Sequence, residues 1–435
     1  MILIICCAIV LILELFFLYK NPRIDKYIFL YFVFSSFLWV IIPSLFVVFD
    51  RSNKYSLEFS KEIFIKYAAY EYFLYTILLF FLNLNPTVKL LYYGKRITNN
   101  IATYRLFWYF FVFIAILNLL MLLNLDVGYR EINDVYYKEK QNTNPIMFFA
   151  NFGISFFFIS VFYLKRNLSK RKIVLTYILL ITTIILNVMQ GGRMQIIFIF
   201  FILIYYILQS SPYKRIKYSI YLSLLLGITI IIIPVIAGVR NSEKLTVSNI
   251  IESIDFTSDI ESEFLFQLVL KLNSINTGAV LVEMERTHPF LTPYLNSLPA
   301  GIPNFFYPGK RPAPGSSNGE LSGSPSRIAA YYIMGNSRFA NVGISTSARA
   351  LWQGGYLFYM LNIIILVYWY RYLNSLLLSG CFYAKMLAFY FTLIALFILP
   401  TGDLIIAEVV KQPMFYFFFI FLSSLTSLKR YYICS

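Results

Sequence analysis

Long apolar runs alternate with short polar connections along the whole chain. Each run is near the roughly 20 residues that a helix needs to cross a bilayer, although a few are shorter. The runs lie at residues 1–19, 27–49, 63–82, 106–124, 146–164, 173–189, 194–208, 218–237, 350–370, 384–400 and 413–428. This pattern predicts an all-α integral membrane protein with about 11 (10–12) transmembrane helices. Spans 1–8 are expected within 1–237 and spans 9–11 within 350–435, with one large outer (periplasmic) loop between them at 238–349.

The composition supports the membrane class. Of the 435 residues, 59% are hydrophobic, well above the roughly 45–50% of a soluble domain. The first run is apolar from its first residue and has no basic leader, so it is expected to be a span and not a cleaved signal peptide.

The net charge of +16 is unevenly distributed along the chain. About 19 lysines and arginines but only one acid, Asp25, fall in alternate connections, which gives these connections roughly +18 and leaves the rest near −2. Positively charged connections remain in the cytoplasm, so the pattern predicts an outer N-terminus and a cytoplasmic C-terminus. The excess charge therefore orients the protein and implies no nucleic-acid partner.

Two carboxylates interrupt apolar runs, Glu14 in the first and Glu71 in the third. A carboxylate inside a membrane span is by default a candidate functional group. The alternative is that each carboxylate pairs with a polar group of another span, and the sequence leaves both interpretations open. Pro43 and Pro234 are expected to kink the second and eighth spans.

A polar break follows the sixth run, where Gly191 and Gly192 permit a tight turn and Arg193 comes directly after them. Glycine and arginine recur in this order at the end of the eighth run, as Gly238 and Arg240. The predicted topology puts both stretches at the outer face. Phosphate groups favour cationic forks and free backbone amides, so both stretches are candidate phosphate sites. The alternative is that the arginines extend to lipid headgroups.

The large loop has three parts. Residues 248–285 have apolar positions at helical spacing, and 286–327 hold half of the chain's prolines. The middle part has few apolar runs and is expected to lie across the membrane-embedded helices. The loop also carries the arginines Arg311, Arg338 and Arg349.

His288 is the only histidine of the chain, and it lies in this loop. Histidine titrates near neutrality and suits proton transfer, although a lone loop histidine is more often solvated. Asp403, in the last outer segment, is a second candidate base. No metal site is predicted, because one histidine with scattered acids lacks ligand spacing and the four cysteines lie in or near spans or on the inner side.

Three landmarks resemble those of the bacterial O-antigen polymerases, the oligosaccharide repeat-unit polymerases of the Wzy type. The stretches that carry the resemblance are Gln190-Gly191-Gly192-Arg193, Gly238-Val239-Arg240, and Gly343-Ile344-Ser345 through Gln353-Gly354-Gly355. The last is similar to the family's G-x-S-x-x-x-E-x-x-x-x-x-G piece, except that Arg349 occupies the usual acidic position. The motifs cover 190–355, and the topology agrees over the whole chain.

The resemblance implies a GT-C-like membrane glycosyltransferase of the bacterial plasma (inner) membrane that needs no metal or other cofactor. Its donor and acceptor would be polyprenyl-diphosphate-linked oligosaccharides in the outer leaflet, as in lipopolysaccharide or capsule biosynthesis. A chain-length regulator and a flippase are candidate partners. The candidate diphosphate ligands are Arg193, Arg240, Arg311, Arg338 and Arg349, with Gly191 and Gly192 shaping the turn and His288 or Asp403 as the base.

Two alternatives remain. An O-antigen ligase would share the topology and the arginines. Ligases more commonly carry a histidine in the large loop, so His288 is consistent with this alternative. A flippase or transporter for lipid-linked sugars would show internal repeats and charged or broken helices at the midplane. The polar residues here concentrate at one face and in one loop, which favours an enzyme.

Overall fold

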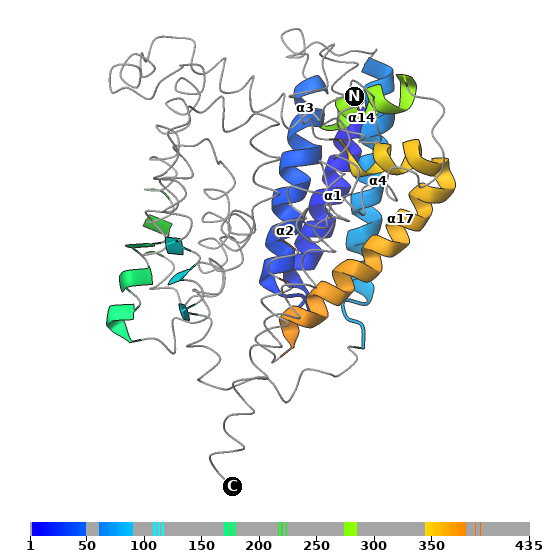
Figure 1. Ribbon diagram of the computed structural model, residues 1–435. Helices are drawn as coiled ribbons and strands as arrows, with labels where there is room; N and C mark the ends of the chain where they lie inside the picture. Colours follow the sequence, from blue (N-terminus) through cyan, green and yellow to red (C-terminus); the bar gives the residue numbers. More distant parts are fainter. Residues whose placement is uncertain are drawn as a thin grey trace, which may run out of the picture. The chain divides into compact units, whose positions relative to one another are not determined.

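The computed structural model describes residues 2–48, 61–89, 274–284 and 344–379, together with scattered residues within 108–116, 169–179 and 216–223 and at 388 and 392. The chain divides into two compact units. Unit 1 comprises Met1–Tyr93, Glu263–Ile302 and Gly309–Tyr416, and unit 2 comprises Gly94–Ser262, Pro303–Pro308 and Phe417–Ser435. All of the helices labelled in Figure 1 belong to unit 1.

Unit 1 is a bundle of helices. In chain order its described elements are α1 (Ile2–Lys20), α2 (Lys26–Ser36), the π-helical turn η1 (Phe37–Ile41), α3 (Ile42–Val48), α4 (Lys61–Leu84), α14 (Ser274–Met284) and α17 (Thr346–Leu378). Helices α1, α4 and α17 begin at the same end of the bundle, and α2 runs in the opposite direction (Figure 1). The described part of the chain is therefore all-helical, as predicted.

Four of the described helices are long and apolar enough to cross a membrane. They are Ile2–Lys20, Lys26–Leu45, Lys61–Leu84 and Thr346–Leu378. These helices confirm the first, second, third and ninth predicted spans as membrane-length apolar helices. Of the remaining predicted spans, the structure describes at most scattered residues.

Helix α1 shows how such a span packs. Its buried side chains, spaced three or four residues apart, form one stripe: Ile4, Ala8, Leu11, Leu15 and Leu18. That stripe gives the helix a face to pack against a neighbour, and α4 is its main partner. The exposed side chains of α1 are also large and apolar, among them Ile12, Leu13 and Phe16. A helix that is apolar all round and exposed on one side is suited to lipid and not to water.

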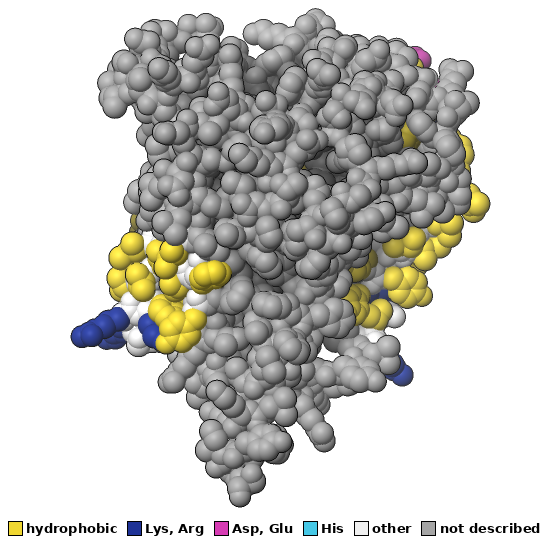
Figure 2. Space-filling view, viewed as in Figure 1, with side chains coloured by type: hydrophobic (Ala, Val, Ile, Leu, Met, Phe, Trp, Pro, Cys, Tyr) yellow, Lys and Arg dark blue, Asp and Glu magenta, His cyan; other side chains and the backbone are white. Residues whose placement is uncertain are grey.

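Apolar exposure is also pronounced on α17, where Leu357, Leu361, Ile364 and Ile365 are all exposed. Figure 2 shows hydrophobic side chains over much of the visible described surface, with lysine and arginine side chains beside some of them. Together with the helix lengths, this surface defines a helical membrane protein.

At the end of the bundle where α1 ends, one side-chain amide bonds to two connecting segments. Asn374 of α17 is fully buried; it accepts a hydrogen bond from the Asp25 N–H (2.9 Å) and donates to the carbonyl oxygens of Arg23 (2.9 Å) and Pro86 (3.0 Å). The connection after α1, the segment after α4 and the last turns of α17 therefore meet at one end. Among the described residues this end carries Lys20, Arg23, Lys26, Lys89 and Arg371, with Asp25 as its acid.

A π-helical turn lies directly before Pro43. The Ile42 N–H donates to the Phe37 carbonyl, five residues back. Proline has no N–H and its ring crowds the preceding turn, so a wider turn accommodates it. The second span therefore contains a π-helical turn, η1, shortly before Pro43, and its predicted kink stays a prediction; Pro234 lies outside the described residues.

Both intramembrane acids hydrogen-bond to another span, as one of the two interpretations predicts. Glu14 Oε2 accepts from Asn83 Nδ2 of α4 at 3.1 Å. Glu71 of α4 accepts from Ser347 of α17. Glu14 is only half-buried and its partner is a neutral amide, whereas Glu71 lies in a buried polar cluster.

Unit 2 has one described cluster of its own. Trp108 Nε1 donates to Thr176 Oγ1 at 2.7 Å, and Lys172 Nζ lies over the Trp108 ring, 4.4 Å from its centroid. A lysine over an indole ring is stabilised by the ring's quadrupole.

Candidate functional site: a buried carboxylate at the start of a broken helix

The start of α17 is built by its capping residue. Ser345 has an extended backbone (φ −60°, ψ 143°), and its side chain accepts from the Ala348 N–H at 3.4 Å. Serine at this position satisfies one of the amides that the first turn leaves without an intrahelical partner. The Ser345 N–H in turn donates to the Ser274 carbonyl at the start of α14, at 2.9 Å.

Helices α14 and α17 approach each other closely at Gly278. A Cβ atom at Gly278 would lie 2.5 Å from Ala348 Cβ and 2.8 Å from Ser345 Oγ. Real Cβ atoms do not come so close, so the approach requires glycine at this position. The contact fixes α14 against the first turn of α17.

The carboxylate of Glu71 accepts two hydrogen bonds from this first turn. Its Oε2 accepts from the Ser347 N–H at 2.9 Å and also from the Ser347 hydroxyl. Glu71 is only 3% exposed, and a buried carboxylate is costly unless it is hydrogen-bonded. The positive end of the α17 dipole stabilises it further.

Arg349 brings a second charge into the same buried region. It follows Ser347 by two residues, is 3% exposed, and its positive charge interacts with the Glu71 carboxylate. Two opposite charges buried together offset part of the cost of removing each from water. Ser345, Thr346 and Gln353 are buried alongside, so the first turns of α17 are polar although they lie inside the protein.

Helix α17 is broken shortly after this polar segment. Gly354 (φ −170°, ψ 22°) and Gly355 (φ 63°, ψ −155°) are not helical. The conformation of Gly355 is one that residues with a side chain rarely adopt. The break separates a short first half, residues 346–353, from a long second half, residues 356–378.

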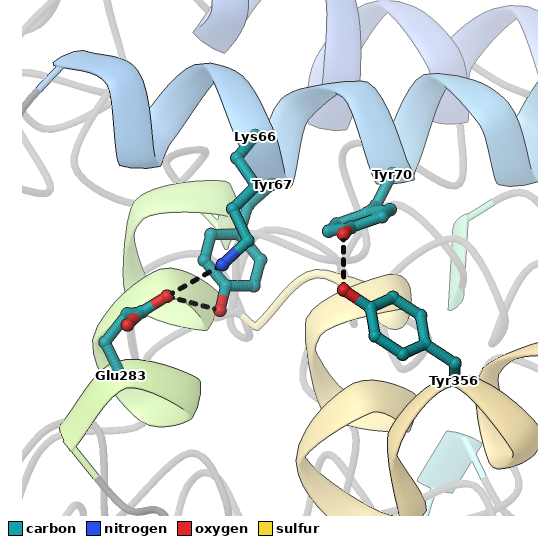
Figure 3. Close-up of polar contacts among 5 residues, drawn as sticks. All are labelled: Lys66, Tyr67, Tyr70, Glu283 and Tyr356. Atoms are coloured by element: carbon teal, nitrogen blue, oxygen red, sulfur yellow. Dashed lines mark hydrogen bonds and ion pairs between the residues drawn. The ribbon is translucent and has the colours of Figure 1, made fainter.

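Helix α4 contacts both halves at adjacent positions. Glu71 holds the first half at Ser347. Tyr70 holds the second half, because its hydroxyl shares a hydrogen bond with the Tyr356 hydroxyl at 2.8 Å (Figure 3). The Tyr70 carbonyl also accepts from the Tyr359 hydroxyl at 2.7 Å. Two adjacent residues of α4 therefore bond to α17 on the two sides of its bend.

One turn earlier, α4 also holds α14. Glu283 Oε1 accepts from Lys66 Nζ at 3.2 Å and from the Tyr67 hydroxyl at 2.9 Å (Figure 3). Lys66 is half exposed, so this ion pair contributes little to stability. Together the bonds from Lys66 and Tyr67 join Glu283 of α14 to α4. This helix also confirms over 274–284 the helix expected within 248–285.

Of the sequence-predicted site residues, the structure describes only Arg349. His288, Asp403, Arg193, Arg240, Arg311, Arg338, Gly191 and Gly192 lie outside the described residues. The prediction placed Arg349 at the end of the outer loop, but α17 begins earlier, at Thr346, and includes it. The helix begins there because Ser345 caps it and because α4 and α14 bury its polar first turn.

The chain was expected to bind no metal. Within the segments that the structure describes, no three His, Cys, Asp or Glu side chains lie together in a way that would hold a metal ion.

The described helices and this buried site place the protein among helical membrane proteins. Comparison of the chain with known protein families, with curated proteins and with solved structures finds no match.

Proposed function

We propose that this protein is a glycosyltransferase of the bacterial plasma membrane that polymerises polyprenyl-diphosphate-linked oligosaccharide repeat units into an O-antigen or capsular polysaccharide. The supporting observation is the buried Arg349 in the first turns of α17, where Ser347 bonds to the buried Glu71 carboxylate, at one end of a bundle of apolar helices. In this proposal the fold is GT-C-like with about 11 spans.

The charge distribution supports an outer location for this pair. Lys20, Arg23, Lys26, Lys89 and Arg371 lie at the opposite end of unit 1, where Asn374 joins the connecting segments. Basic ends of membrane helices remain in the cytoplasm. Arg349 then lies towards the leaflet that holds the lipid-linked substrates.

Arg349 suits the chemistry of the proposed reaction. A hydroxyl of the acceptor sugar attacks the anomeric carbon of the donor glycan, and the bond from that carbon to the diphosphate oxygen breaks. The hydroxyl proton passes to a base, and polyprenyl diphosphate leaves with the bonding electrons. Negative charge grows on the diphosphate as the bond breaks, and a cation in a dry site stabilises that charge most strongly where it is greatest.

The other roles come from the sequence. Arg193, Arg240, Arg311 and Arg338 are the further proposed diphosphate ligands, and His288 and Asp403 are the proposed bases. The removal of one such cationic donor costs roughly 3 kcal/mol of transition-state stabilisation in comparable anion sites.

Deletion of the gene in its host tests the proposal. The surface lipopolysaccharide or capsule is separated on a gel, with the deletion complemented by the wild-type gene as control. The proposal predicts loss of the long ladder with survival of a band that carries a single repeat unit. Loss of every repeat-bearing band would point instead to the ligase or the flippase.

A further inference from the structure

We infer that Glu71 is a positioning residue for Arg349: its carboxylate fixes the first half of α17, and with it the guanidinium that the proposed reaction uses. The structural part of this inference stands on the contacts of Glu71 alone. The part that concerns catalysis rests on the proposed function.

The first half of α17 needs support of its own. The break at Gly354 and Gly355 interrupts the helical backbone, so residues 346–353 do not continue the long second half as one helix. Eight helical residues are too few to be stable in isolation, and tertiary contacts must hold such a segment. Arg349 lies in the middle of this segment.

Three contacts supply that support. Apolar packing joins Ile344 and Trp352 to Leu281 of α14. The Ser345 N–H bonds to the Ser274 carbonyl, and Gly278 admits Ala348. The third contact is the Glu71 carboxylate on Ser347. The first two come from the large loop, whereas the third comes from a membrane span.

The Glu71 contact differs from the others because it is charged. It neutralises part of the helix dipole and it interacts with the buried charge of Arg349. Loss of that charge would remove a favourable interaction from a buried cation, and a buried charge without compensation is costly. Without the Glu71 charge, Arg349 is expected to turn towards water or towards another anion.

The second half of α17 has a separate connection to α4. It is held through the hydrogen bonds that Tyr356 and Tyr359 make to Tyr70, and Tyr359 also hydrogen-bonds to Ser347 and interacts with the Glu71 charge. Because the bonds to Tyr70 do not involve Glu71, a change at Glu71 should displace residues 346–353 more than residues 356–378.

A double-mutant cycle tests whether Glu71 acts through Arg349. Chain extension is measured in liposomes with the purified protein and lipid-linked repeat units, for wild type, Glu71→Gln, Arg349→Ala and the double variant. Glutamine keeps the size and an acceptor oxygen for Ser347 but lacks the charge. Glu71→Gln is expected to lower the rate roughly 100-fold, as small misplacements of a catalytic group do.

The rate of the double variant decides whether Glu71 acts through Arg349. If Glu71 acts through Arg349, the double variant is no slower than Arg349→Ala alone. A double variant whose loss is the product of the two single losses would overturn the inference, as would full activity of Glu71→Gln. Glu14→Gln is the matched control, since it removes another intramembrane acid that bonds to Asn83, and it should extend chains at the wild-type rate.

A labelling experiment separates this inference from the proposed function. With the four native cysteines replaced by alanine, a cysteine is placed at Ala350, which is 1% exposed in the first half of α17, or at Ala68, which is fully buried on α4. Glu71→Gln is expected to raise the maleimide labelling rate at position 350 about tenfold, because local opening exposes buried side chains, and to leave position 68 protected.

The outcomes distinguish the two proposals. Unchanged labelling at position 350 would overturn the positioning role whatever the protein catalyses. Increased labelling in a protein that cannot extend lipid-linked glycans would support the positioning role and contradict the polymerase.

Discussion

Asn374 joins two connecting segments at the basic end of unit 1. Its side chain makes three hydrogen bonds to backbone groups of two other segments while fully buried. Asn374→Ala would leave these backbone groups without their partner, and each buried unsatisfied group costs about 1–3 kcal/mol. We expect a clearly lower free energy of unfolding, measured by denaturant titration in detergent micelles.

Asn362→Ala is the control for this prediction. Asn362 lies on the same helix and is half-buried, and no hydrogen bond joins its side chain to other described residues. Equal losses of stability in the two variants would show that the Asn374 bonds contribute nothing specific.

The sequence indicates some residues of the candidate site but not the contacts between them. Glu71 and Arg349 could be singled out because charges in or beside apolar runs are costly. Their proximity could not, because 276 residues separate Glu71 from Ser347 and no local pattern relates them. The signal that the sequence does contain is the polar run Ser345-Thr346-Ser347, which is a capping sequence next to a span.

At the scale of the element, the break in α17 depends on one glycine. Gly355 has φ 63°, whereas Gly354 has an extended φ of −170° that other residues also adopt. No other atom lies within 4 Å of a Cβ built at Gly355, so any cost of a side chain there comes from the backbone. Gly355→Ala should lower the free energy of unfolding by about 1–3 kcal/mol.

Gly354→Ala is the matched variant for this prediction, because it adds the same methyl group one residue earlier. It should cost less than Gly355→Ala in the same denaturant titration. A larger loss at Gly354 would mean that the break is held by packing and not by the left-handed backbone of Gly355.

The sequence predicted the described elements better than their ends. Four expected spans are present because about 20 apolar residues suffice to indicate a membrane helix. The ninth span was expected at 350–370 but runs from Thr346 to Leu378. Hydropathy misses its first turn, because that turn is polar and is buried against α4 and α14 and not in lipid.

At the scale of the whole molecule, the two ends of unit 1 differ in charge, and this difference predicts its orientation. Glu62, near the start of α4, and Lys89, shortly after its end, are both exposed. A cysteine that replaces Glu62 should react with a membrane-impermeant maleimide on intact cells, because this end is predicted to face outwards. A cysteine that replaces Lys89 should react only after the cells are opened. The reverse pattern would put the Glu71 and Arg349 site on the cytoplasmic side, away from the proposed substrates.

The global arrangement was the least predictable part of the fold. Hydropathy alone cannot show that α1 packs chiefly on α4 or that α14 packs on both α4 and α17. These contacts depend on side-chain shape, as at Gly278, and not on hydrophobicity, which is nearly uniform among membrane helices.

Reconstitution is the most direct test of the central claim. The purified wild-type protein is placed in liposomes with polyprenyl-diphosphate-linked repeat units as its only substrate, and the lipid-linked products are separated by size. The account predicts a ladder of products that grow by whole repeat units, and the loss of that ladder with Arg349→Ala. A protein that is folded but leaves the single repeat unit unextended would contradict the account.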